Sequence, residues 1–227
     1  MQQLQPDVYL MEGLRAAHAY LLTSEAGHTL VDAGTPGEAD RIQGEIEDGG
    51  FSLSDVKAIV LTHAHNDHMG SAAELARRSG AEVLAHQAGV PYIEGTAPLP
   101  FTALHKRAFS WLGDQLFRAE PCTVSRALQD GDVIDALGGL RIVHAPGHTP
   151  GCMALHQPDR QILFLGDVFF HRGEGIGLPP AIVSVDVDLA AASARAVAAL
   201  PAEVACFGHG EPILEGAGTR LHEAVSG

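Results

Sequence analysis

The sequence predicts an α/β protein in which two mixed β-sheets stack face to face between outer helices, a four-layer αββα sandwich. In each half of the chain, short apolar runs separated by turn residues precede segments with helical periodicity. This repeated order favours two stacked sheets over one wound parallel sheet. The 227 residues, 46% apolar and 19% charged, are enough for one large domain with a sizeable core.

The first third of the chain is expected to form five strands and two helices. Thr35 and Pro36 suit the N-cap and the first residue of a helix that extends to about Asp48. Apolar residues at helical spacing predict a second helix that begins at Asp67 and stops at Gly80. The expected strands are Val8–Met11, Ala19–Thr23, Thr29–Val31, Val56–Leu61 and Glu82–Ala85.

The stretch from residue 91 to residue 121 has no strand pattern. Apolar residues recur there at helical spacing, namely Phe101, Leu104, Ala108, Trp111, Leu112 and Leu116. Such a helix can face the core, face a second subunit or roof a substrate cleft, and its residues do not separate these alternatives. We therefore expect one domain over residues 1–227 with an inserted helical segment at about 91–121, and a homodimer stays open.

The second half repeats the order of strands followed by helices. Helices are expected at about Asp188–Leu200 and near Glu215–Val225. The expected strands are Val124–Leu128, Asp132–Leu137, Leu140–His144, Met153–His156, Ile162–Leu165 and Val204–Phe207.

The densest group of metal-binding side chains is the segment HAHNDH, which spans residues 63–68. It follows the apolar run VKAIVL, so it lies at the carboxyl end of a strand, where sites of α/β proteins usually lie. His63 and His65 project to the same side of an extended loop, whereas Asp67 and His68 approach from the start of a helix. Taken alone, the segment also fits a His-rich surface loop.

Three later turns each present one metal-binding side chain directly after a strand. His148 lies in the turn APGHTPG, Asp167 ends the apolar run ILFLG, and His209 lies in FGHG. Each of these residues, taken singly, also fits a turn or a cap. Four strand ends that all deliver imidazoles or carboxylates predict a shared metal site.

The HAHNDH, PGHTPG, GD and GHG segments, in this order and at comparable spacing, resemble the metallo-β-lactamase superfamily from about Tyr9 to His209. The resemblance implies the αββα fold with a dinuclear site in the cleft at the sheet edges. It implies that Asp167 bridges the metals and that Asp32 orients a ligand histidine. The implied ligands are His63, His65 and His148 for the first metal and Asp67, His68 and His209 for the second.

The expected cofactors are two divalent metal ions. Imidazoles and carboxylates suit Zn²⁺, and Fe²⁺ or Mn²⁺ are alternatives. Asp67 is the expected catalytic residue, since it can accept a hydrogen bond from the attacking hydroxide and carry a proton to the leaving group. His171 and Arg172 follow Asp167 by a few residues and are candidates for substrate contact, with a solvated face as the alternative.

The predicted function is a dinuclear metal-dependent hydrolase that attacks the carbonyl of a thioester, ester or lactone. An Asp at position 167 disfavours a β-lactam substrate, because β-lactamases of this fold carry Cys or Ser there. One alternative is a mononuclear non-haem iron persulfide dioxygenase that uses His63, His148 and Asp167. A further alternative is a metal-binding protein without turnover.

Charge and hydropathy exclude two classes of partner. The net charge of −14 repels nucleic acid. No apolar run approaches the ~18 residues of a membrane helix, and the N-terminus shows no secretory signal. We therefore expect a cytoplasmic protein with a small-molecule substrate.

Overall fold

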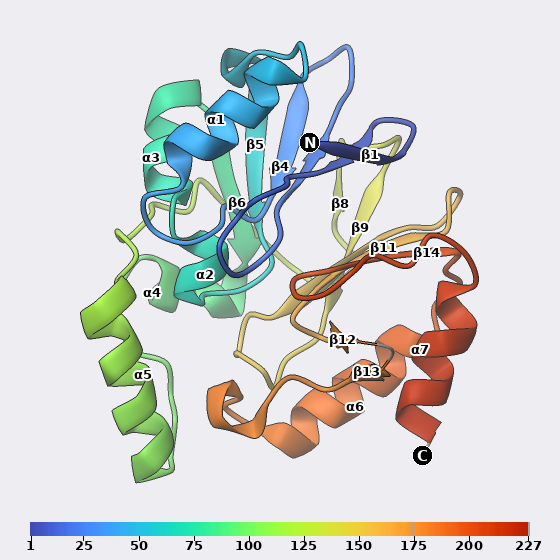
Figure 1. Cartoon of the computed structure of the whole chain (residues 1–227). Coiled ribbons are helices and arrows are strands. Elements are labelled where there is room, and N and C mark those ends of the chain that lie inside the picture. Colours follow the sequence, from blue (N-terminus) through green and yellow to red (C-terminus); the bar gives the residue numbers. More distant parts are fainter. Residues whose placement is uncertain (174, 227) are drawn as a thin grey trace.

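The computed structural model describes residues 1–173 and 175–226, apart from the side chain of Asp114. Two large β-sheets face each other, and helices cover the outer side of each sheet (Figure 1). A small third sheet is a single hairpin. The predicted four-layer αββα sandwich is confirmed.

The first sheet has seven strands in chain order. The first four are antiparallel and the last four are parallel, with β4 belonging to both sets. The carboxyl ends of β4 and β5 therefore meet at one edge. The strands are β1 (Gln2–Gln5), β2 (Val8–Leu10), β3 (Tyr20–Leu22), β4 (His28–Val31), β5 (Val56–Leu61), β6 (Glu82–His86) and β7 (Arg126–Leu128).

The second sheet has the order β14-β11-β10-β9-β8. Only β11 and β14 are parallel, so these two strands also end at the same edge. The strands are β8 (Val133–Ile134), β9 (Leu140–His144), β10 (Met153–Gln157), β11 (Ile162–Gly166) and β14 (Val204–Phe207). The third sheet pairs β12 (Phe170–Arg172) with β13 (Gly175–Gly177).

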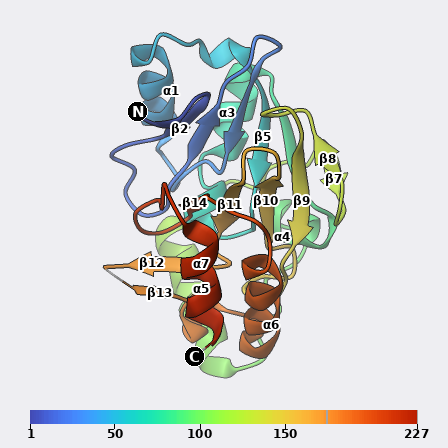
Figure 2. The same cartoon turned by 90° about the vertical axis from the view of Figure 1, so that its right-hand side faces the viewer.

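Each large sheet is covered on its outer side by its own pair of helices. Helices α1 (Ala39–Asp48) and α3 (Ala72–Ser79) cover the first sheet, and α6 (Val187–Ala198) and α7 (Ala217–Ser226) cover the second (Figure 2). No helix in the described part of the chain is long and apolar enough to cross a membrane. A further helix of 14 residues is α5 (Leu104–Phe117). The shorter elements are α2 (Asn66–Met69), α4 (Val90–Ile93) and the 3₁₀ turns η1 (Leu53–Asp55), η2 (Gln87–Gly89) and η3 (Ala181–Val183).

Three apolar clusters fill the three interfaces between the four layers. In β11, Ile162 and Phe164 pack between the sheets, whereas Leu163 and Leu165 pack toward α6 and α7. All five residues of β11 are buried, because both faces of the strand are covered. This burial of both faces explains why the segment ILFLG is apolar throughout.

The start of α1 differs from the expected one. The helix begins at Ala39, and Thr35 is not its N-cap. Instead, the Thr35 backbone N–H and its Oγ1 both donate to the buried carboxylate of Glu38, each at 2.7 Å. The loop that follows β4 is therefore closed by a side chain within it.

The single helix expected between Asp67 and Gly80 is two helices, α2 and α3. The backbone N–H groups of Gly70 and Ser71 donate to Gly34 and Ala33 rather than continuing the helical ladder. A Cβ at Gly70 would also lie 2.3 Å from the backbone nitrogen of Pro36. Contact with a loop distant in sequence thus overrides local periodicity.

Smaller differences concern short strands. The expected strand Asp132–Leu137 is limited to Val133–Ile134 (β8), and Val124–Leu128 is limited to Arg126–Leu128 (β7). Strands β1, β12 and β13 were not expected. Each of these three has only three or four residues, too few for a clear alternation.

The segment 91–121 contains α5 and no strand, as expected. The large apolar side chains of α5 are 50–79% exposed, so the core-facing interpretation is wrong. In Figure 1 this helix stands apart from the sandwich, at the lower left.

Replacing the fully buried Leu155, in the cluster between the sheets, with alanine is expected to destabilise the protein by about 2–5 kcal/mol. The matched Leu116→Ala change on exposed α5 is expected to stay within about 0.5 kcal/mol. Urea unfolding followed by circular dichroism measures both. Equal losses for the two variants would contradict the assignment of the central core.

Candidate metal centre

Seven imidazole and carboxylate side chains converge at the edge where β4, β5, β11 and β14 end. They form two groups, and within each group the potential ligand atoms lie within 4.8 Å of one another. The first group comprises His63, His65, His148 and Asp167, and the second comprises Asp67, His68 and His209. The structure thus brings together every metal ligand that the sequence predicted.

Asp167 lies between the two groups. Its Oδ2 is 3.1 Å from His148 Nε2 and 3.6 Å from His63 Nε2. Its Oδ1 is 3.2 Å from His68 Nε2, and His209 Nε2 is 3.6 Å from Oδ2. One buried carboxylate therefore faces imidazoles of both groups.

Gly208 provides the room for this arrangement. A Cβ at Gly208 would lie 2.5 Å from Asp167 Oδ1 and 2.6 Å from His68 Cε1. Only glycine therefore fits before His209 in the turn after β14. The GHG motif has a steric explanation in addition to a chemical one.

Asp32, directly after β4, holds one ligand ring by a hydrogen bond. His68 Nδ1 donates to its Oδ2 at 2.8 Å, and the Thr62 backbone N–H and Oγ1 donate to its two oxygens, both at 2.8 Å. The φ of Asp32 is 60°, a left-handed conformation that Asp adopts more readily than most residues. These bonds fix the His68 ring with its Nε2 facing Asp167.

Two hydroxyl groups that sequence reasoning missed orient two further rings. Thr62 Oγ1 accepts from His63 Nδ1 at 3.1 Å, and Ser184 Oγ accepts from His148 Nδ1 at 3.2 Å. Each contact directs the Nε2 of its ring toward the centre, where His63 Nε2 also lies 3.1 Å from His65 Nδ1. Thr62 directly precedes HAHNDH and could have been suspected, but Ser184 is 36 residues from His148 and carries no sequence signal.

The buried polar atoms at the centre fit a divalent cation. Among the described residues, His148 Nε2 and Asp167 Oδ1 are buried without a hydrogen-bond partner. Such atoms are rare in proteins, and a bound cation would satisfy their lone pairs. The donor set of imidazole nitrogens and carboxylate oxygens is the one that zinc and other divalent transition metals take.

Protonation at the centre follows from burial and neighbouring charge. Burial lowers the pKa of His65 to about 3 and that of His63 well below its usual value, so both rings are neutral at pH 7. Burial opposes charge on His209 too, but hydrogen bonds to Asp167 and Asp67 raise its pKa to about 9. A cation bound there must displace that proton.

Of the two candidate substrate-contacting residues, Arg172 lines the cleft beside the metal centre and His171 does not. His171 is buried; its Nδ1 donates to the Glu211 carbonyl at 2.6 Å and its Nε2 accepts from Arg220 at 3.2 Å. The Arg172 guanidinium lies 4.8 Å from the ring centroid of Phe170.

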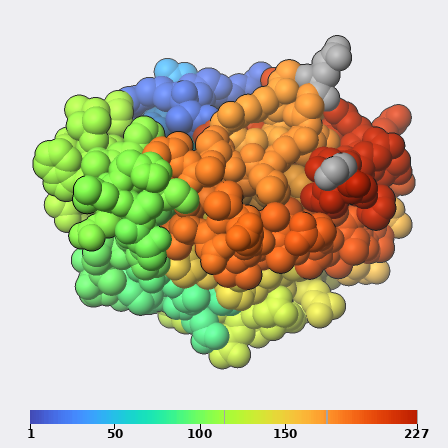
Figure 3. Space-filling model, turned by 90° about the horizontal axis from the view of Figure 1, so that it is seen from below, coloured from blue at the N-terminus to red at the C-terminus, as the bar shows by residue number. Residues whose placement is uncertain are grey.

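A cleft of about 980 Å³ opens beside the metal centre, and His65, Asp67, Asp167 and His209 contribute to its lining. Its other walls come from α4, α5, η3 and the loop after β2. Figure 3 shows α5 and the segment before α6 side by side on this face of the molecule.

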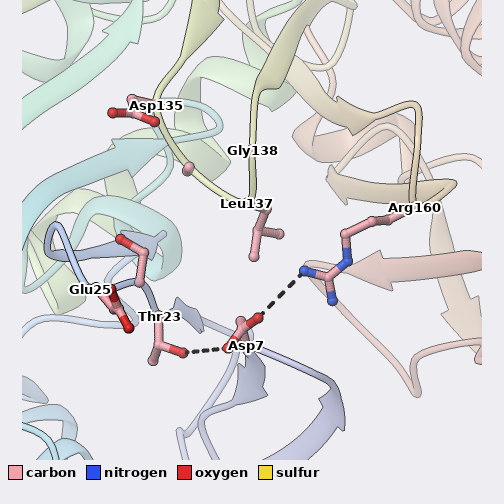
Figure 4. A pocket seen from close by; sticks show the side chains of 9 residues that line it. Asp7, Thr23, Glu25, Asp135, Leu137, Gly138 and Arg160 are labelled. Carbon is pink, nitrogen blue, oxygen red and sulfur yellow. Dashed lines mark hydrogen bonds and ion pairs between the residues drawn. The ribbon is translucent and has the colours of Figure 1, made fainter.

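A second pocket, of about 360 Å³, lies at the opposite ends of the strands (Figure 4). Asp7 is one of its lining residues, with Thr23 Oγ1 donating to Oδ1 at 3.5 Å and the Arg160 guanidinium 3.9 Å from Oδ2. None of the metal-binding candidates lines it.

The sequence profile described as the metallo-beta-lactamase superfamily matches residues 13–209, and the chain belongs to this family. The resemblance noted in the motifs is therefore confirmed. Membership implies divalent metal binding and places the chain among metallo-hydrolases.

Relatives agree with this assignment, and a solved structure shares the fold. The chain is 31% identical over 207 residues to “Probable metallo-hydrolase YflN” of Bacillus subtilis, covering 81% of this chain and 75% of the relative. It is 30% identical over 155 residues to “Hydroxyacylglutathione hydrolase GloC” of Haemophilus influenzae, covering 66% and 65%. The metallo-beta-lactamase family protein TTHA1429 of Thermus thermophilus is 24% identical and shares the fold, with a TM-score of 0.76 over 98% of this chain and 78% of that one.

Replacing Ser184 with alanine is expected to weaken metal binding about 10- to 100-fold, because His148 loses the partner that fixes its ring. Ser193→Ala is the matched control, since its hydroxyl donates to the Pro146 carbonyl and contacts no candidate ligand. Competition with a chromophoric chelator measures the affinity of both variants. Unchanged affinity in Ser184→Ala would rule out the orienting role.

Proposed function

We propose that this protein is a hydrolase that uses two divalent cations, most simply zinc, to attack an ester-like carbonyl. His63, His65 and His148 would hold the first cation, Asp67, His68 and His209 would hold the second, and Asp167 would serve both. The position of Asp167 between the two groups, 3.1–3.6 Å from four imidazoles, is the observation that carries the proposal. The whole chain is taken as one domain with residues 91–121 inserted at the cleft.

When bound, the cations supply a water of lowered pKa and polarise the scissile carbonyl. The chain's own residues do the rest. In hydrolysis, the water oxygen bonds to the carbonyl carbon and the bond from that carbon to sulfur or oxygen breaks. The leaving atom keeps the electron pair of that bond and needs a proton.

Asp67 is suited to carry that proton. It lines the cleft, so its carboxylate can reach both the attacking water and the leaving atom. Its Oδ2 lies 3.3 Å from His209 Nε2, which fixes the side chain at the edge of the centre.

A thioester is the favoured substrate within the ester-like class. The relative GloC is named as a hydroxyacylglutathione hydrolase, and an acyl group on the glutathione sulfur is a thioester. An ester or a lactone would be attacked at the same carbonyl carbon by the same groups.

The Asp67→Ala variant is expected to lose at least about 100-fold in turnover while keeping its fold. Asp135→Ala, an exposed carboxylate in the remote second pocket, is the matched control and is expected to keep full activity. Turnover of thioesters, esters and lactones by metal-quantified protein is the measurement. Wild-type rates in Asp67→Ala would contradict the assigned role.

Metal content separates this proposal from its alternatives. We expect about two zinc-type ions per chain, loss of activity on chelation and its return on adding zinc. One iron per chain with oxygen consumed on glutathione persulfide would establish the dioxygenase instead. Stable metal binding without any turnover would indicate a binding protein.

A further inference from the structure

We propose that the cleft binds thioesters with a long apolar acyl chain and an anionic carrier, the chain lying against the aromatic wall formed by α5. This inference rests on the proposed hydrolase function, because the carbonyl must reach the metal centre. It goes further by assigning the substrate's two ends to different walls of the cleft.

The first argument is the apolar lining. Phe101, Phe109, Trp111 and Phe117 line one wall, and Ile182 and Val183 from η3 also face the cleft. Phe109, Trp111 and Phe117 are 50–63% exposed, an unusual amount of aromatic surface left to water on one helix. An acyl chain would cover this surface.

The second argument is size. At about 980 Å³ the cleft is at the upper end of small-molecule sites, which span roughly 300–1,000 Å³. An acyl group of two or three carbons would leave most of the aromatic wall in water. A long chain would use it.

The third argument is charge. The protein carries 28 acids against 14 bases, yet the basic residues Arg15, Arg118 and Arg172 line the cleft. The acidic residues described in the lining are Asp67 and Asp167, both at the metal centre. All three arginines are exposed. A locally positive rim on an acidic protein favours an anionic carrier, such as one bearing phosphates.

The fourth argument is that both ends of the α5 wall are tied to the metal centre. Near its start, Lys106 Nζ donates to the Ser184 carbonyl at 2.8 Å, and the hydroxyl of the same serine orients His148. Past its end, the Ala119 backbone N–H donates to Asn66 Oδ1 at 3.2 Å, within HAHNDH. The aromatic wall thus has a defined position relative to the reacting carbonyl.

The test is direct binding of S-alkyl thioethers of coenzyme A, which cannot be hydrolysed, with alkyl chains of 2 to 10 carbons. Trp111 is the only tryptophan, so its fluorescence reports occupancy of the cleft without turnover. We expect the Kd to fall about threefold to fourfold for each added methylene until the wall is covered. A Kd independent of chain length would overturn the proposal.

Variants test separately the wall that would bind the acyl chain and the arginines that would bind the carrier. Phe109→Ala is expected to weaken binding of the 10-carbon thioether about tenfold and that of the 2-carbon thioether less than twofold. Leu116→Ala, on the same helix but outside the lining, is the matched control and should change neither. The double change Arg118→Gln with Arg172→Gln should weaken the coenzyme A thioethers about tenfold at low salt. The same double change should leave uncharged N-acetylcysteamine thioethers unaffected.

The outcome for this cleft is separable from the outcome for the proposed function. Chain-length-dependent binding with no hydrolysis of any acyl thioester would support the cleft assignment and contradict the hydrolase. Hydrolysis of short and long acyl thioesters at equal kcat/KM, with no effect of Phe109→Ala, would support the hydrolase and overturn the cleft assignment.

Discussion

The carboxylate of Asp167, buried among four imidazoles, is the interaction on which the rest of the site depends. A charge removed from water is costly unless opposite charges or donors surround it. Here burial opposes ionisation of Asp167, but the surrounding imidazoles, His68 foremost, hold its pKa well below the usual range. Those partners come from the ends of β5 and β14 and from the β9–β10 loop, so both sheets must stack in register for the carboxylate to be tolerated.

Hydrogen bonds from residues around the centre fix the orientation of its imidazole rings. Asp32, Thr62 and Ser184 each receive an N–H from one ring, which selects the tautomer and fixes the ring plane. Asp32 does so from a left-handed backbone conformation, at the end of a strand that is parallel to β5. The structure tolerates local strain here because it positions two neighbouring elements at once.

The two sides of the cleft are built differently. The side that carries the imidazoles and carboxylates consists of strand ends, held by three apolar clusters. The opposite side consists of α5, η3 and connecting loops, which contribute little to the core. Rigid strands suit groups that must keep their relative positions, and loops suit the surface that selects a ligand. The chemistry and the ligand preference therefore reside in different segments of the chain.

The sequence by itself determined the layers and the candidate ligands. Apolar runs that end in HAHNDH, PGHTPG, GD and GHG marked four strand ends, and strands such as Val56–Leu61 and Leu140–His144 were predicted to the residue. The spacing of apolar residues predicts which positions are buried, and the motifs predict which side chains can bind a metal. Both predictions need only residues that are near one another in the sequence. Only the tertiary structure decided that the Ser184 hydroxyl orients His148 and that the Glu38 carboxylate closes the loop before α1. It likewise decided that the helical ladder breaks at Gly70 between α2 and α3. It also decided that the apolar residues of α5 are exposed, several of them facing a cleft, rather than buried in the core. These outcomes depend on contacts between segments distant in sequence, and local patterns carry no information about such contacts.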